Sequence, residues 1–98
     1  MIESGGLRID DAAREAAFDG RALTLTAREF DLLRFFARNP GRVLAREELL
    51  RKVWGYDYLG ETRTVDVHVR RLRQKLGEPV DVRLETVVGV GYRWRSAS

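Results

Sequence analysis

The sequence predicts an α+β domain with a small antiparallel sheet at its N-terminus, three helices and a C-terminal β-hairpin. Strand-like runs occur only near the two ends of the chain, whereas the middle, about residues 26–76, carries apolar residues at helical spacing. The 98 residues suffice for one hydrophobic core and are too few for two. We therefore expect a single domain that spans residues 1–98.

Three strand-like segments precede the first helix. Leu7–Asp10 alternates apolar and polar residues, as a half-buried strand does. The segments 14–18 and 21–25 are joined at Asp19-Gly20, a dipeptide typical of a tight hairpin turn. These residues predict an antiparallel sheet, although the alanines between positions 12 and 17 are weak strand formers.

Start and stop signals define the first two helices. Thr26 with Glu29 three residues later forms a capping box, and Asn39-Pro40-Gly41 ends the helix. We expect the buried face of this helix to consist of Phe30, Leu33, Phe36 and Ala37. Leu32 and Phe35 are expected at the margins of that face. A shorter helix follows over residues 46–54, with Leu49, Leu50 and Val53 inward, Ala45 as a poor N-cap and Gly55 as its stop.

The third helix is expected over residues 62–76, and its two faces differ. The apolar face consists of Val65, Val69, Leu72 and Leu76. The opposite face carries Arg63, Val67, Arg70, Arg71 and Gln74, flanked by His68, Arg73 and Lys75. Residues 61–76 have a net charge of +3, and the charges of residues 1–60 sum to zero. We expect Asp66 to pair with Arg70 at i+4 without neutralising this face.

The outward face of the third helix has the chemistry that the major groove of DNA requires. Arginine binds guanine through two hydrogen bonds, glutamine pairs with adenine, and valine contacts the methyl group of thymine. The alternative is a plain solvated helix face, which is the common meaning of such charge runs. An exposed Val67 among cations, and Asp66 as the single acid between Arg63 and Gln74, favour DNA binding.

Two further segments stand out beyond the helices. Gly55–Gly60 is polar and aromatic and is expected to be a loop that presents Tyr56, Asp57 and Tyr58. Residues 84–88 and 92–95 are strand-like and are joined around Gly89-Val90-Gly91. This glycine pair lacks the third glycine and the following helix of a dinucleotide-binding fingerprint, so we interpret it as a hairpin turn.

The composition excludes several classes of protein. Without cysteine there is no disulfide or thiolate metal site, and His68 has no second ligand type beside it, so neither a metal site nor a cofactor is expected. The adjacent Glu47 and Glu48 point about 100° apart on a helix and cannot act as an acid/base pair, and no other catalytic group is evident, so we expect no enzyme. No apolar run suffices for a membrane helix and no signal peptide is evident, which predicts a cytoplasmic protein.

Over residues 7–95 the chain resembles the winged-helix effector domain of OmpR/PhoB-type two-component response regulators. The motifs that carry the resemblance are Leu25-Thr26-x-x-Glu29, Val53-Trp54-Gly55, the run RTVDVHVRRLR at 63–73, and Thr86-Val87-x-Gly-x-Gly91-Tyr92. The resemblance implies a four-stranded N-terminal sheet and a C-terminal hairpin wing. It also implies transcriptional regulation by sequence-specific binding of double-stranded DNA, with the helix at 62–76 in the major groove and the wing at 84–95 alongside.

The resemblance also assigns roles to single residues. Arg71 would read a base with Val67 as its apolar companion, and the residues that would contact the phosphate backbone are Arg63, His68, Arg70, Arg73, Trp54, Thr86 and Tyr92. For Trp54 the alternative is a core position, since it ends an amphipathic helix. The loop with Tyr56, Asp57 and Tyr58 matches the segment that contacts RNA polymerase in relatives. Two copies of the domain are expected to bind a direct repeat head-to-tail.

Two departures from the family pattern bear on function. Val88 stands where the family typically has a wing arginine, so we expect a weaker minor-groove contact unless Arg93 or Arg95 substitutes. The N-terminal receiver domain of the relatives is absent from this chain, which indicates either a fragment of a longer regulator or a stand-alone regulator, and we favour the fragment. A different class of function stays open: a winged-helix module that binds the transcription machinery through the loop at 56–58 and the surface of the first helix.

Overall fold

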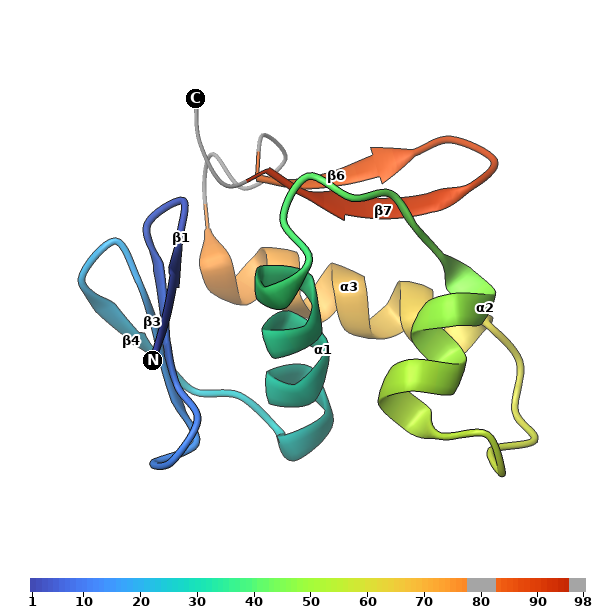
Figure 1. The fold of residues 1–98 in the computed structure, drawn as a ribbon, viewed down its shortest axis with the longest axis horizontal. Coiled ribbons are helices and arrows are strands. Elements are labelled where there is room, and N and C mark those ends of the chain that lie inside the picture. Colours follow the sequence, from blue (N-terminus) through green and yellow to red (C-terminus); the bar gives the residue numbers. More distant parts are fainter. Residues whose placement is uncertain (78–82, 96–98) are drawn as a thin grey trace.

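The computed structural model describes residues 1–77 and 83–95 and confirms the expected α+β architecture. In Figure 1 the N-terminal sheet lies at one end, α1 crosses the middle in front of α3, and the C-terminal hairpin lies above the helices. The elements are β1 (Ile2–Ser4), β2 (Leu7–Asp10), β3 (Glu15–Phe18), β4 (Arg21–Leu23), α1 (Ala27–Arg38), β5 (Leu44–Ala45), α2 (Arg46–Leu49), η1 (Leu50–Trp54), α3 (Arg63–Leu76), β6 (Leu84–Val87) and β7 (Gly91–Trp94).

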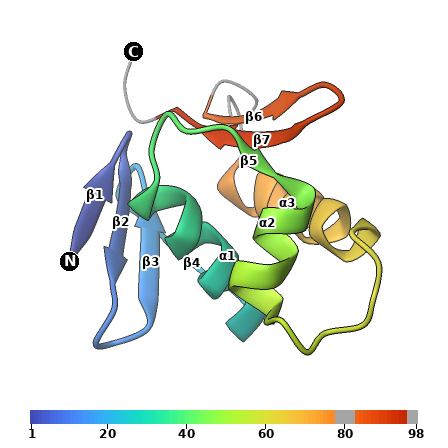
Figure 2. The same ribbon diagram turned by 45° about the vertical axis from the view of Figure 1, so that its right-hand side comes forward.

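The N-terminal sheet has four antiparallel strands in the order β1-β2-β3-β4 (Figure 2). Asp19 and Gly20 both have positive φ, 50° and 82°, which is the backbone of a two-residue hairpin turn and confirms the turn predicted there. The first strand, in which Ile2 pairs with Ile9, was implied by the family resemblance alone. The sheet buries the side chains of Leu7, Ile9, Ala16 and Phe18.

Helix α1 begins with the predicted capping box. The Thr26 hydroxyl accepts a hydrogen bond from the backbone N–H of Glu29 at 3.2 Å, and the Glu29 carboxylate accepts one from the N–H of Thr26 at 2.9 Å. The placement of Leu32 at the margin of the buried face was wrong, because its side chain has no exposed surface. Since α1 contacts β1, η1, α3 and β7, its buried face is wider than a single stripe.

The second helix occupies the expected residues but changes geometry along its length. α2 covers Arg46–Leu49 and continues as η1, a π-helix of five residues, which ends where the N–H of Gly55 donates to the carbonyl oxygen of Leu50 at 3.2 Å. Ala45 makes no side-chain cap, as expected. Leu49 and Leu50 are buried, whereas Val53 is only partly buried against the core. The wider turn of a π-helix shifts the residues after Leu50 around the axis.

The C-terminal hairpin, the wing, is held to the rest of the domain at both ends. β7 lies between β6 and the short β5, so the hairpin belongs to a three-stranded sheet of order β5-β7-β6. A Cβ on Gly91 would lie 2.0 Å from the carbonyl oxygen of Leu44, so only glycine allows β5 and β7 to come this close. Trp94 is fully buried and donates its indole N–H to the Ser4 hydroxyl at 3.1 Å, which links the wing to β1.

Replacement of Thr26 by alanine is expected to lower the free energy of unfolding by about 1 kcal/mol, because the N-terminus of α1 loses a side-chain cap. Urea unfolding followed by circular dichroism measures the change. Thr24→Ala is the matched control, since Thr24 is exposed and its side chain makes no hydrogen bond among the described residues. Equal stability of the two variants would contradict the role of the capping box.

Candidate nucleic-acid interface

Helix α3 presents its two predicted faces. Val65, Val69, Leu72 and Leu76 are all buried at no more than 1% exposure, which confirms the apolar face. On the opposite face Val67 is 39% exposed, an unusual position for a valine between charged residues. The exposed residues that share this face with it are Arg63, Arg70, Arg71 and Gln74. The helix therefore offers cations, an amide and one methyl-bearing side chain to solvent on a single surface, which we call the α3 outer face.

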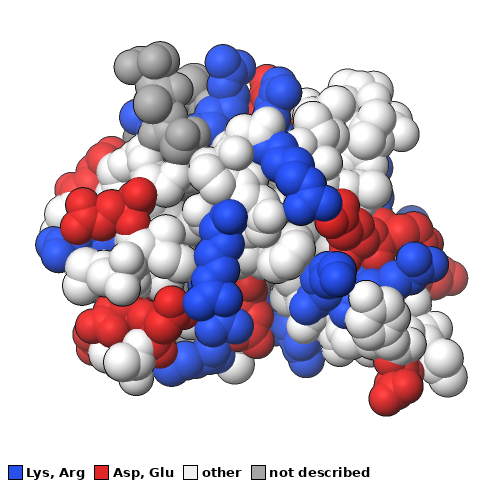
Figure 3. All heavy atoms as spheres, in the orientation of Figure 1, with Lys and Arg blue, Asp and Glu red and all other residues white. Residues whose placement is uncertain are grey.

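The arginines of the α3 outer face have no acidic partner in the described part of the chain. Arg63, Arg70 and Arg71 make no ion pair and no side-chain hydrogen bond with any residue in 1–77 or 83–95. Arginines on α1 differ, because Arg34 and Arg38 both bind Asp11. The face that carries α1 accordingly shows basic and acidic side chains interspersed (Figure 3). Within the described residues, α3 therefore carries three exposed arginines without an ion pair, and Arg51 and Lys52 on η1 are further exposed cations without one.

Asp66 does not pair with Arg70, and that prediction was wrong. Its carboxylate binds Nε of Arg46 at 2.8 Å and accepts a hydrogen bond from the hydroxyl of Tyr92 at 2.6 Å. The reason lies in tertiary structure: the start of α2 and strand β7 both lie beside α3, and a partly buried partner competes better than an exposed one at i+4. The single contact joins α2, α3 and the wing, and it leaves Arg70 free.

Two carboxylates beside α3 and in the wing, those of Asp66 and Glu85, have pKa values below their ordinary range. Partial burial acts to raise the pKa of Asp66, but the hydrogen bonds from Tyr92 and Arg46 and the charge of Arg46 outweigh it and lower the pKa. Burial and the hydrogen bond to Asp66 raise the pKa of Tyr92. Hydrogen bonds from Arg93 hold the pKa of Glu85 below its usual value. Both carboxylates are therefore ionised at neutral pH and remain bound to their arginines.

His68 and Trp54 lie against each other beside the α3 outer face. Their ring centroids are 4.9 Å apart in an edge-to-face arrangement, and the Arg28 guanidinium lies 5.4 Å from the Trp54 ring. Nδ1 of His68 lies 2.7 Å from the carbonyl oxygen of Thr64. Because a carbonyl oxygen only accepts, Nδ1 carries the proton and the ring orientation is set. Trp54 is half-buried and packs against the core, so its position is compatible both with a core role and with a contact to the phosphate backbone.

Arg73 connects α3 to the wing. Its guanidinium donates to the carbonyl oxygen of Leu84 at 2.8 and 3.1 Å and to the hydroxyl of Thr86 at 2.6 Å, and it lies over the Tyr92 ring at 5.6 Å. Tyr92 is only 5% exposed. Of the residues assigned to the phosphate backbone, Arg73, Tyr92 and Thr86 thus have protein partners already, and of these three Thr86 is exposed.

The tip of the wing is apolar. Val88 is 90% exposed and Val90 is 48% exposed, on either side of Gly89, which confirms a hairpin turn there. Arg93 binds Glu85 through Nε at 2.7 Å and Nη2 at 2.6 Å, and Arg95 binds the same carboxylate at 3.5 Å. Neither arginine therefore stands free to replace a cation at Val88.

The loop between η1 and α3 exposes more apolar surface than the sequence predicted. Tyr56 is 72% exposed, and Asp57 and Tyr58 are exposed as expected. Leu59 is 96% exposed and was not among the candidate residues. The available signal was its position in a glycine-flanked segment with no helical or strand periodicity, where an apolar side chain has no core to enter.

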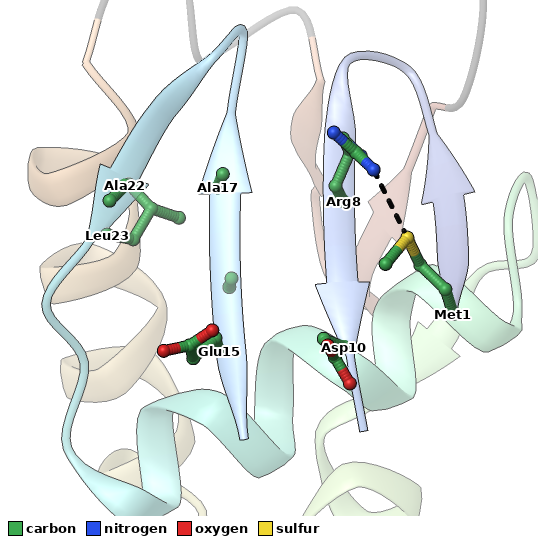
Figure 4. A pocket seen from close by; sticks show the side chains of 8 residues that line it. Met1, Arg8, Asp10, Glu15, Ala17, Ala22 and Leu23 are labelled. Atoms are coloured by element: carbon green, nitrogen blue, oxygen red, sulfur yellow. Dashed lines mark hydrogen bonds between the residues drawn. The ribbon is translucent and has the colours of Figure 1, made fainter. Parts of the chain in front are cut away.

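Among the described residues, few features point to a metal site, a ligand pocket or a membrane-spanning helix. In the described part of the chain, no group of three or more His, Cys, Asp or Glu side chains could hold a metal ion. A shallow pocket on the N-terminal sheet is lined by side chains that include Arg8, Asp10 and Glu15, with alanines between them (Figure 4). Among the same residues, no helix has both the length and the apolar character needed to cross a membrane.

Comparison with known proteins defines the class. Residues 20–94 match the family model described as "Transcriptional regulatory protein, C terminal", and the chain belongs to this family. It is 49% identical over 98 residues to the sensory transduction protein RegX3 of Mycobacterium leprae, covering 98% of this chain and 50% of that protein. It is 50% identical over 95 residues to the transcriptional regulatory protein VxrB of Vibrio cholerae, covering 97% of this chain and 38% of that protein. The chain thus spans half or less of the length of these relatives.

Solved structures agree with the family assignment. The RstA DNA-binding domain of Klebsiella pneumoniae, solved in complex with the RstA box, superposes with a TM-score of 0.85 at 34% identity, covering 97% of this chain and 96% of that one. The DNA-binding domain of CpxR from E. coli superposes with a TM-score of 0.82 at 35% identity, covering 99% and 97%. The resemblance to winged-helix effector domains of response regulators is confirmed.

Asp66→Asn is expected to lower the free energy of unfolding at pH 7 by about 1 kcal/mol, a figure discounted for solvent screening because the Asp66 side chain is 41% exposed. The folded-state pKa of Asp66 lies below the unfolded value of about 3.8. The ionic stabilisation is therefore fully present above that value and is lost as the pH falls through the folded-state pKa.

The stability difference between wild type and Asp66→Asn should be constant from pH 5 to 7 and shrink in strongly acidic buffer, as measured by urea titrations at each pH. Asp57→Asn is the matched control, since Asp57 is exposed in the loop and has no arginine partner among the described residues. A difference that does not change with pH would contradict an ionic role for Asp66.

Proposed function

We propose that this chain is the DNA-binding effector part of a two-component response regulator and recognises specific sequences in double-stranded DNA. Helix α3 enters the major groove and the wing lies alongside. The observation that carries the proposal is the α3 outer face, where Arg63, Arg70 and Arg71 are exposed beside Val67 and Gln74 and pair with no acid among residues 1–77 and 83–95. Solved relatives whose names describe DNA complexes, of RstA and AdeR, support it.

By their proposed roles, the residues of the α3 outer face and its surroundings fall into three groups. Arg71, Val67 and Gln74 read base edges, because their side chains are exposed and have the donors and the methyl groups that bases match. The groups that contact phosphates are Arg63, Arg70, His68, Trp54 and Thr86. Arg73 and Tyr92, which also match family positions for phosphate contact, hold the wing against α3 and reach DNA only at the edge of the interface.

The proposal extends to the whole protein through the lengths of the relatives. Because the chain spans 50% of RegX3 and 38% of VxrB, we infer a longer regulator with an N-terminal receiver domain. Two copies would bind a direct repeat head-to-tail in the cytoplasm. No cofactor and no catalytic step are needed for this activity.

The loop between η1 and α3 supports contact with a protein as a second candidate function. Tyr56, Tyr58 and Leu59 are exposed within four residues of each other, on either side of Asp57, and the core does not use them. Exposed aromatic and aliphatic side chains are enriched where proteins bind each other. The partner that suits a transcriptional regulator is RNA polymerase, and this contact is compatible with DNA binding through α3.

Selection from a pool of randomised duplex DNA tests the function directly. The purified chain is expected to enrich one motif, and the logarithm of its binding constant should fall with the logarithm of salt concentration with a slope of about −4, since four or five phosphates are contacted. No enrichment by the chain, alone or as a dimeric fusion that supplies a second copy, would contradict DNA recognition and favour the protein-binding function.

Arg71→Ala is expected to cost about 1–3 kcal/mol on the selected sequence and to relax the preference at one base position. Arg63→Ala is the matched comparison on the same face: it should weaken binding to all sequences alike and reduce the salt slope by about one. Fluorescence anisotropy on the selected site and its single-base variants separates the two. A uniform loss for Arg71→Ala would contradict its role as the base reader.

Val88→Arg is expected to strengthen binding to a site flanked by A·T pairs, because the wild-type wing tip carries two valines and no free cation. The measurement is affinity for two duplexes that differ only in the flank, A·T-rich or G·C-rich. Val88→Gln is the control for length without charge. Unchanged affinity of Val88→Arg for both duplexes would show that the wing tip does not reach the minor groove.

A further inference from the structure

The C-terminus of α3 is capped by an arginine from the N-terminal sheet. Arg21 begins β4, and its Nη1 donates to the carbonyl oxygen of Lys75 at 3.1 Å while Nη2 donates to that of Leu76 at 2.6 Å. The last four carbonyl groups of an α-helix have no partner within the helix. A guanidinium at this end also interacts favourably with the helix dipole. One side chain thus satisfies two terminal acceptors of the helix that we propose reads DNA.

A second contact from the N-terminal half of the chain holds the same helical turn. The ammonium group of Lys75 lies 2.6 Å from the carboxylate of Glu29, which is only 1% exposed. Glu29 is itself fixed by the capping box at the start of α1. The last turn of α3 is therefore tied to β4 on one side and to α1 on the other.

The residues on this turn explain why its order matters for function. Gln74 lies in the last turn and Arg71 one turn earlier, and both are exposed on the α3 outer face. The backbone N–H of Gly77 bonds to the carbonyl oxygen of Arg73 at 3.1 Å, and Gly77 leaves the helix with a φ of 81°. If the terminal carbonyls lose their partner, this turn is the part of α3 that frays, and the side chains that contact bases lose their fixed direction.

We propose that Arg21 is a positioning residue for DNA recognition, which caps the C-terminus of α3 and thereby orients Gln74 and Arg71 toward the bases. The N-terminal sheet is then a working part of the DNA-binding unit. This inference rests on the proposed function, since it assigns α3 the task of reading DNA. Arg21 acts on the helix backbone and contributes no phosphate contact.

The test compares Arg21→Gln with Arg8→Gln. Both variants remove one positive charge from the same sheet, but Arg8 lies on β2, and its side chain is 60% exposed and pairs with Glu3. It points toward Met1 (Figure 4). Arg21→Lys is the conservative variant, since one ammonium group can serve only part of the cap. The readouts are amide hydrogen exchange, thermal unfolding, affinity for the selected duplex, and the salt slope of that affinity.

Arg21→Gln is expected to speed amide exchange at residues 72–77 more than elsewhere in the chain and to weaken specific binding about three- to tenfold. The salt slope should stay at the wild-type value, because no phosphate contact is lost. Arg21→Lys should recover part of the affinity, and Arg8→Gln should match wild type. A purely structural role would instead speed exchange throughout the chain and lower the melting temperature without a local effect.

Three results would overturn the inference. The first is wild-type affinity of Arg21→Gln, and the second is a salt slope reduced by about one, which would make Arg21 a phosphate contact. The third is unchanged exchange at residues 72–77. If the wild-type chain selects no DNA at all, the proposed function fails, and the exchange data still show separately whether Arg21 caps α3.

Discussion

The burial of one face of α3 is the constraint on which the rest of the structure depends. Val65, Val69, Leu72 and Leu76 are in the core, so a rigid 14-residue helix must present its other side to solvent. That side holds Arg63, Val67, Arg70, Arg71 and Gln74. The core thereby determines which side chains can meet a partner, and the hydrophobic residues specify the binding surface as firmly as the polar ones do.

Polar contacts then set the position of α3 relative to its neighbours. Asp66 joins α3 to Arg46 at the start of α2 and to Tyr92 in β7, and Arg73 joins α3 to Leu84 and Thr86 in the wing. These contacts give the charged residues of the run at 63–73 two different roles. The acid and the arginine that face protein elements hold the helix and wing together, while the arginines that face outward keep their charge for a ligand. A substitution of a residue that faces the protein is therefore expected to loosen the packing of α3 against α2 and the wing, whereas one of a residue that faces outward alters the surface offered to a ligand.

Local signals in the sequence predicted the helices and the turn well, because capping, periodicity and positive-φ dipeptides act over a few residues. The capping box of Thr26 and the Asp19-Gly20 turn are examples. Contacts between distant segments could not be predicted in this way. Asp66 was expected to bind Arg70 because helix spacing offers that partner, yet Arg46, twenty positions away, is the one it binds. Arg21 was missed for the same reason, since its role depends on the end of α3, which lies beside it in the fold.

In the wing, ion pairs determine which charges are available to a ligand more than composition does. Residues 83–95 contain three arginines, which suggests a basic hairpin. In the structure Arg93 and Arg95 share Glu85, and the tip consists of Val88 and Val90 around a glycine. Among the described residues, α3 therefore carries more exposed and unpaired arginines than the wing does. Under the proposed function, the arginines that attract DNA and the groups that read bases lie on the same helix, so the direction of α3 affects both the approach to DNA and the recognition of its sequence.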